Sequence, residues 1–131
     1  MKKSILIFAS LMLVIALSSF KSSSSKTSWL DGNWKGEKYQ VNMQKAWKTE
    51  LTIDTKSKTF TVSYPELNCK GYLVLESATK NQAIFIEKLD AGSCMSDGYI
   101  MINKVSEKLI TFVCLRDNKT RLASFSTLEK Q

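Results

Sequence analysis

The 131-residue chain contains no histidine, one proline and five isolated glycines. Without histidine, Ser-His and Cys-His nucleophile pairs and histidine-ligated zinc sites are excluded. No glycine opens a predicted helix, so a glycine-rich phosphate loop is not expected, and three scattered cysteines do not form a thiolate cage. Two carboxylates, Glu87 and Asp90, lie near a predicted turn without any sign of a glycosidase cleft. We therefore expect no enzyme, no metal and no cofactor.

Long apolar runs are also missing, except for thirteen residues from Ile5 to Leu17. Lys2 and Lys3 precede this run and small polar residues follow it, which is the layout of a secretory signal. The run is shorter than the ~20 residues that span a bilayer, so a retained membrane anchor is the less favoured alternative. We predict a cleaved signal in residues 1–20, a serine- and lysine-rich tether in residues 21–28 and one domain in residues 29–131. The serine run at 22–25 leaves the cleavage site open, and the expected location is the periplasm or the outside of the cell.

Charge of one sign is not concentrated anywhere in the chain. The net charge is +7, and removal of Lys2 and Lys3 would leave 17 basic against 12 acidic side chains. Nucleic-acid binding normally requires a clustered basic stripe, whereas these lysines are interleaved with acidic residues. The composition predicts a soluble monomer that binds no nucleic acid and keeps no stable membrane anchor, with weak attraction to anionic envelope polymers as a minor option.

Three cysteines remain in a chain that we expect to enter an oxidising compartment, where thiols can pair. Three pairings are possible, and the position of each cysteine along its predicted strand decides between them. Cys114 lies inside an apolar run, residues 109–115, whereas Cys69 and Cys94 flank turn-like segments. We predict a Cys69–Cys94 disulfide, which would contribute on the order of 3 kcal/mol by loop entropy, and Cys114 as a small core residue.

No helix is predicted after the signal, because no window keeps apolar residues at a spacing of 3.6 with a capping residue. Instead, residues 47–53 and 59–64 alternate between two faces on either side of a turn at 54–58, which predicts a hairpin. The same pattern extends over eight predicted strands: 34–41, 47–53, 59–64, 70–76, 82–89, 99–105, 108–115 and 122–128. Short polar turns join them, so the fold class is all-β and neighbouring strands should pair antiparallel. We predict a closed, up-and-down, eight-stranded β-barrel, with a two-sheet β-sandwich as the alternative.

The start of the first predicted strand carries a Gly-x-Trp sequence, formed by Gly32 and Trp34. This sequence resembles the first strand of lipocalins and avidins. The resemblance implies a tryptophan that closes one end of the barrel, often under an arginine from the last strands, here Arg116 or Arg121. A tryptophan in an ordinary first-strand core is the structural alternative.

A second motif, Tyr64-Pro65-x-Leu67-x-Cys69-x-Gly71, is followed by residues 85–89, Gly92, Cys94, Asp97 and Gly98. Together they resemble a small bacterial extracytoplasmic domain, of the lipocalin-like calycin type, found in short secreted proteins and in extracellular parts of some bacterial serine/threonine kinases. The resemblance implies a cysteine-stapled barrel with a sensing or binding role that is unassigned, and no known reaction. This chain departs from it at Tyr99, where the family commonly has a second glycine.

Glu87 is the one residue of this segment whose presence is not explained by the needs of a strand, a turn or a disulfide. It shares a strand face with Phe85 and Leu89, so an inward Phe85 face would place an acid inside the barrel. Its partner would then be Tyr64, Arg116 or Arg121. The alternatives are a structural ion pair, or a strand whose Ile84 and Ile86 face the core.

We therefore expect a secreted, non-catalytic binding module. One hypothesis places a small amphipathic ligand in the barrel mouth, with Tyr64, Phe85, Glu87 and Arg121 as binding residues. The other is a solid barrel that binds an envelope protein, for example as a periplasmic inhibitor of a cell-wall hydrolase. Large residues that could fill such an interior are Trp47, Leu51, Phe60, Tyr64, Phe85, Phe112 and Phe125. Candidate protein contacts are Tyr72, Met95 and Tyr99, although surface tyrosines are also common without any partner.

Overall fold

A computed structural model describes residues 26–91 and 94–131. The predicted signal, residues 1–20, and most of the predicted tether lie outside the described residues. The described ranges contain no helix that could span a lipid bilayer.

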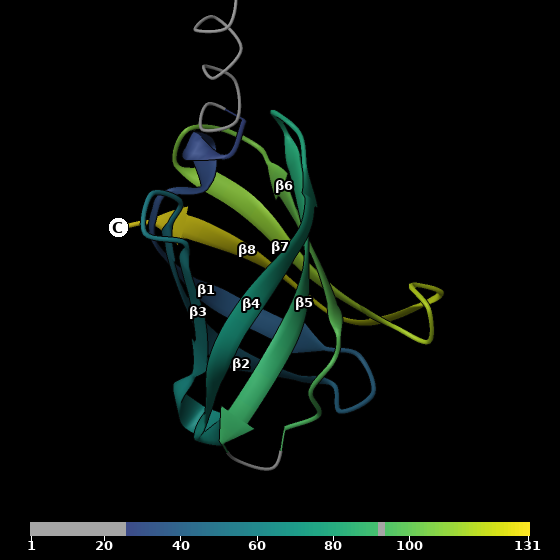
Figure 1. Cartoon of the computed structure of the whole chain (residues 1–131). Coiled ribbons are helices and arrows are strands. Elements are labelled where there is room, and N and C mark those ends of the chain that lie inside the picture. Colours follow the sequence, from purple (N-terminus) through teal and green to yellow (C-terminus); the bar gives the residue numbers. More distant parts are fainter. Residues whose placement is uncertain (1–25, 92–93) are drawn as a thin grey trace, which may run out of the picture.

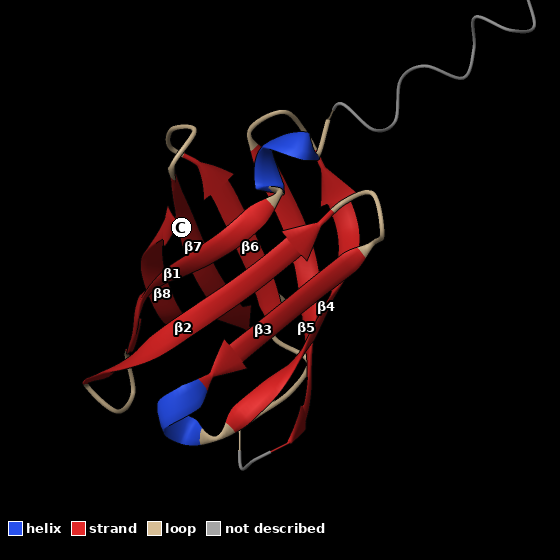
Figure 2. Cartoon of the chain, turned by 90° about the vertical axis from the view of Figure 1, so that its left-hand side faces the viewer, coloured by secondary structure: helices blue, strands red, loops and turns tan. Residues whose placement is uncertain are grey.

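The chain forms a closed antiparallel barrel in which each strand pairs with its neighbours in sequence (Figures 1 and 2). The strands are β1 (Gly32–Gln40), β2 (Lys45–Asp54), β3 (Thr59–Tyr64), β4 (Cys69–Ala78), β5 (Gln82–Ala91), β6 (Tyr99–Lys104), β7 (Leu109–Arg116) and β8 (Arg121–Lys130). Two short 3-10 helices, η2 (Ser28–Leu30) and η3 (Pro65–Leu67), lie before β1 and between β3 and β4. The prediction of an all-β, eight-stranded, up-and-down barrel is confirmed, and the sandwich alternative is wrong.

Pairing of the first and last strands closes the barrel. In the register of β1 with β8, Trp34 lies opposite Lys130 and Tyr39 lies opposite Phe125. The backbone N–H of Gln131 adds a hydrogen bond of 2.8 Å to the carbonyl of Asn33. Closure leaves no free strand edge, the feature through which open sheets associate.

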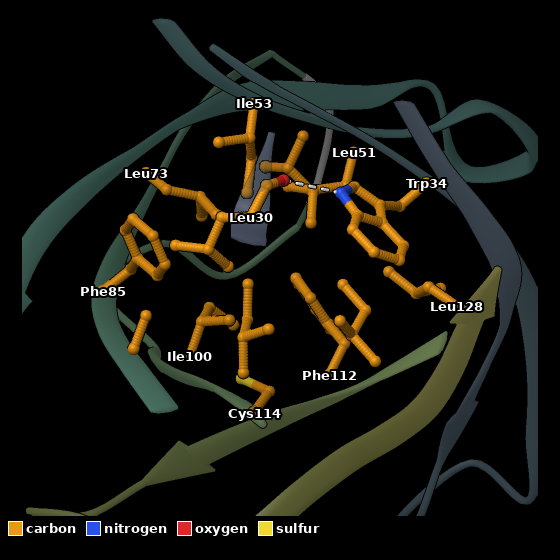
Figure 3. Close-up of a cluster of buried hydrophobic side chains, with 14 of the residues drawn as sticks. Leu30, Trp34, Leu51, Ile53, Leu73, Phe85, Ile100, Phe112, Cys114 and Leu128 are labelled. Carbon is orange, nitrogen blue, oxygen red and sulfur yellow. Dashed lines mark hydrogen bonds between the residues drawn. The ribbon is translucent and has the colours of Figure 1, made fainter. Parts of the chain in front are cut away.

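One end of the barrel is plugged by η2 and the side chain of Trp34. The indole is fully buried, and its N–H donates a hydrogen bond of 2.8 Å to the carbonyl of Leu30 (Figure 3). The cation above the ring is Lys130, whose Nζ lies 5.2 Å from the ring centroid. The expectation of Arg116 or Arg121 is wrong, because β7 ends and β8 begins at the opposite end of the barrel.

The half of the barrel next to this plug is filled by apolar side chains. Figure 3 shows Leu51, Phe85, Ile100 and Phe112 pointing toward one another in this core, and all four are buried. Phe60 packs its ring 5.5 Å from that of Phe85.

Phe125 does not belong to this core, contrary to the prediction. The inward residues of β8 near the mouth are Ser124 and Ser126, and both are buried. Phe125 is 45% exposed, and its ring lies 5.5 Å from that of Tyr39 on the outside of the barrel. Apolar character therefore does not mark the inner face of β8 at this end.

The predicted disulfide is present. Cys69, the first residue of β4, is bonded to Cys94, which follows β5, with a Cα–Cα distance of 6.2 Å. The bridge ties the start of β4 to the segment between β5 and β6 at the mouth. Cys114 is a free, buried thiol, as predicted.

Gly71 marks an irregularity between β4 and β5, where the register shifts at Lys70/Gly71. A Cβ atom built on Gly71 would lie 1.9 Å from the carbonyl oxygen of Lys88. The two backbones approach too closely for any other residue, which accounts for the glycine of the motif.

Candidate functional site

A cavity of about 260 Å³ opens at the end of the barrel opposite Trp34, where η3 and the β1–β2, β5–β6 and β7–β8 connections lie. Polar and apolar side chains share its wall. The lining residues are Lys38, Gln40, Asn42, Met43, Tyr64, Leu67, Glu87, Leu89, Cys94, Met95, Cys114, Arg116, Arg121, Ala123 and Ser124. The barrel is therefore solid in the half next to Trp34 and hollow at the mouth.

Glu87 points into the barrel from β5 and is 2% exposed. Its Oε2 accepts a hydrogen bond from the hydroxyl of Tyr64, which is 1% exposed and ends β3. Burial raises the pKa of Glu87, although the charge of Lys38 and the Tyr64 hydrogen bond oppose that shift. The Phe85 face of β5 is thus the inner face, and the alternative with Ile84 and Ile86 in the core is wrong.

Burial also raises the pKa of Tyr64 well above its usual value, and the carboxylate of Glu87 adds to the effect. The phenol therefore stays protonated and remains a hydrogen-bond donor to Glu87. Of the three partners considered for this acid, Tyr64 is the one that makes the direct hydrogen bond.

Lys38 is the second buried charge at the mouth, with 7% of the residue exposed. Its Nζ lies 3.5 Å from the centroid of the Tyr64 ring, a cation–π contact. No described residue accepts a hydrogen bond from this ammonium. Burial lowers the pKa of Lys38, and the nearby charge of Glu87 opposes this shift.

Sequence reasoning missed Lys38, although a signal was available. The strand period of two places Lys38 on the same face as Trp34, which was already assigned to the inside. Two further polar atoms of the neighbouring β2 strand, Trp47 Nε1 and Thr49 Oγ1, are buried without a partner among the described residues. The interior near the mouth thus has unused hydrogen-bonding capacity.

The guanidinium groups of the two arginines at the mouth already donate hydrogen bonds to oxygens of the protein. Arg116 donates hydrogen bonds of 2.6 Å to the carbonyls of Met95 and Ser96, and so holds the β5–β6 connection. Arg121 donates a hydrogen bond of 2.6 Å to the carboxylate of Asp117, and both side chains are exposed. Lys38 differs from them because it has no such acceptor.

The predicted binding residues are only partly brought together. Tyr64, Glu87 and Arg121 line the cavity, whereas Phe85 lies deeper in the apolar core and does not line it. Whether the three lining residues bind a ligand stays a prediction.

Among the described residues, no group of three His, Cys, Asp or Glu side chains could hold a metal ion. Burial raises the pKa of the Cys114 thiol, and the charge of Glu87 raises it further. A protonated thiol is a poor nucleophile. The lining residues of the mouth include hydrogen-bonding, charged and apolar side chains.

A scan against protein-family models, a search of the curated proteins and a search of the solved structures each gave no match. The chain is thus described by its fold alone, an eight-stranded, all-antiparallel, closed β-barrel with a cavity at its mouth.

Proposed function

We propose that the protein is a secreted, non-catalytic binding module that holds a small amphipathic molecule in the barrel mouth. The observation that carries this proposal is a cavity with buried polar groups, Lys38, Tyr64 and Glu87, beside an apolar wall that includes Leu67 and Leu89. In small-molecule sites, placed polar groups fix the orientation of the ligand and apolar side chains contact the rest of it, and the wall of this cavity contains both kinds of group. The disulfide supports the oxidising location that the proposal includes.

The volume limits the size of the ligand. A cavity of about 260 Å³ has room for roughly nine water molecules at ~30 Å³ each. The ligand buried there is therefore a molecule of about ten non-hydrogen atoms, or the end of a longer one whose remainder extends into solvent.

Native mass spectrometry of the periplasmically expressed protein tests the proposal. We expect an added mass that disappears on denaturation. Ala123 lines the cavity and is half-buried, so Ala123→Trp should fill the mouth and abolish the added mass. Ala46→Trp, at an exposed position of β2, is the matched control and should keep it. A clean protein mass for the wild type, or equal occupancy in Ala123→Trp, would count against a ligand in the mouth.

A second candidate function is binding of an envelope protein such as a cell-wall hydrolase, and the outer face of the barrel favours it. Cross-strand pairs join Met101 to Val113, Val113 to Phe125 and Phe125 to Tyr39. Aromatic and methionine side chains are enriched at interfaces. Of the contacts predicted earlier, Tyr72 is 51% and Met95 is 69% exposed.

Tyr99, the third predicted contact, is half-buried and lies under Lys119, whose Nζ is 4.6 Å from its ring centroid.

An assay of hydrolase inhibition distinguishes this second function. Wild-type protein should slow the clearing of a peptidoglycan suspension by the hydrolase, and Phe125→Asp should lose the effect. Thr127→Asp, at another exposed position of β8, is the control. Equal inhibition by the wild type and Phe125→Asp would show that Phe125 and its cross-strand neighbours Val113 and Tyr39 do not contact the hydrolase.

A further inference from the structure

The charges around the cavity are not balanced. Three cationic side chains line it, Lys38, Arg116 and Arg121, against one carboxylate, Glu87. The acid that pairs with Arg121, Asp117, does not belong to the lining. A concave, partly desolvated site with an excess of positive charge attracts anions.

Lys38 is the cation of this cavity whose ammonium lacks a hydrogen-bond acceptor among the described residues. It is 7% exposed, and its ammonium contacts the face of the Tyr64 ring without any hydrogen-bond acceptor among the described residues. Because Lys38 lines the cavity, its ammonium can donate hydrogen bonds to a molecule that enters the cavity, and hydrogen bonds made by a charged donor are the stronger ones. Arg116 and Arg121 lack this property because their guanidinium groups already bind carbonyl and carboxylate oxygens.

Glu87 restricts the charge that the incoming group can carry. Its carboxyl lines the same cavity and is held by the Tyr64 hydroxyl. A dianion such as a phosphate monoester would place two negative charges near this acid, whereas a cationic group would meet the ammonium of Lys38. A ligand with one negative charge therefore fits the cavity best, because it pairs with Lys38 and is repelled less by Glu87 than a dianion would be.

The apolar part of the wall sets the orientation of the ligand. Met43, Leu67 and Met95 belong to the connections at the mouth, between β1 and β2, in η3 and between β5 and β6. Lys38 lies within β1 and reaches inward. An amphipathic molecule therefore enters with its charged group toward Lys38 and its hydrocarbon part along these mouth residues.

From these observations we propose that the mouth binds a short amphipathic monocarboxylate, whose carboxylate accepts hydrogen bonds from the ammonium of Lys38. This inference rests on the proposed ligand-binding function and specifies the chemical class of the ligand.

Isothermal titration of the wild type with octanoate, octanamide and octylamine tests the class directly. The three probes share one hydrocarbon chain and differ in the charge of the head. Both the carboxylate and the amide oxygen can accept a hydrogen bond from the Lys38 ammonium, but only the carboxylate adds the attraction between opposite charges, so we expect octanoate to bind about ten-fold or more tightly than octanamide. Octylamine should bind most weakly, since its head would face Lys38.

Variants assign the effect to Lys38. Lys38→Met keeps the hydrocarbon stem and should lower the affinity for octanoate by about ten-fold. The affinity for octanamide should fall by a smaller factor, because the neutral amide loses a hydrogen bond but no attraction between charges. Lys35→Met is the matched control, because Lys35 lies on the same strand but is exposed and pairs with Glu50. Glu87→Gln removes the negative charge from the cavity and should tighten octanoate binding.

The outcomes separate this inference from the proposed function. Equal affinity for octanoate and octanamide in the wild type would overturn the carboxylate assignment and leave ligand binding in place. No heat from any of the three probes would overturn both. If Lys38→Met does not fold, the probe comparison in the wild type and the effect of Glu87→Gln still decide, and weaker octanoate binding by Glu87→Gln would contradict the charge argument.

Discussion

At the scale of single residues, the mouth combines two buried charges that most interiors avoid. Lys38 and Glu87 come from β1 and β5 and share Tyr64, whose ring contacts the ammonium and whose hydroxyl binds the carboxylate. No ion pair of 4 Å or less joins Lys38 to Glu87 within the described part of the chain. A buried charge without a close ionic partner costs stability, and such costs are typical of sites that bind something.

The raised pKa of Glu87 predicts a specific pH dependence. An acid whose pKa is higher in the folded than in the unfolded protein stabilises the fold below the unfolded pKa, and this contribution is lost as the pH rises through the folded pKa. The groups that oppose the shift are Lys38 on β1, Tyr64 on β3 and Arg116 on β7. Relative to Glu87→Gln, the wild type should therefore lose stability as the pH rises above about 4.5, by at most about 1.4 kcal/mol per pH unit.

Urea denaturation of both proteins between pH 4 and pH 8 measures this difference. Glu129→Gln, which removes an exposed carboxylate of β8, is the control for the loss of one negative charge. Parallel stability curves for the wild type and Glu87→Gln, or a difference that changes in the wild type's favour with rising pH, would refute the burial argument.

At the scale of the elements, the strands were predictable because their polar turns are clear and most inner positions are apolar. The inner face of β5 could not be read from its sequence, because Ile84 and Ile86 on one face are as apolar as Phe85 on the other; the structure places Phe85 and Glu87 inside. The same reasoning failed where the barrel interior becomes polar: Phe125 was placed inside β8, whereas Ser124 and Ser126 occupy that face. Register across β1 and β8, which pairs Phe125 with Tyr39, depends on closure of the barrel and cannot be read from one strand.

Gly71 should be intolerant of any side chain. In Gly71→Ala the new Cβ would lie 1.9 Å from the Lys88 carbonyl oxygen and 2.8 Å from the Leu89 Cα. Both are backbone atoms, so β4 and β5 would have to separate, and we expect a loss of about 1–3 kcal/mol of stability. The midpoint of urea denaturation measures it, with Ser77→Ala at an exposed position of β4 as the control. A midpoint like that of the wild type would show that the strands separate at little cost.

At the scale of the whole molecule, two features join parts of the chain that are distant in sequence. The β1–β8 pairing closes the barrel, and the disulfide links Cys69 to Cys94, 25 residues later. The disulfide and the closed barrel were both predicted from the sequence. The cavity was not predictable in the same way, because its volume depends on how side chains from several strands meet.

Reduction of the disulfide should lower the stability of the barrel without removing the fold class. For a loop of about 25 residues the expected loss is on the order of 3 kcal/mol, or about 10–20 °C in Tm for a domain of this size. Thermal denaturation with and without reductant measures the shift. Cys69→Ala/Cys94→Ala should melt at the lower temperature in both conditions, whereas Cys114→Ala should keep the response to reductant. A Cys114→Ala protein that no longer responds would show that Cys114 takes part in the bond.

The plug and the mouth lie at opposite ends of the barrel, and this separation has a consequence for attachment. The description of the chain starts just before η2 and ends at Gln131, after β8, and both ends lie at the plugged end, where the N–H of Gln131 donates a hydrogen bond to the carbonyl of Asn33 (Figure 1). A linker joined to either end would leave the barrel from its base. On a solid support, a cell surface or a fusion partner, the opening would then be presented outward and stay accessible from solution.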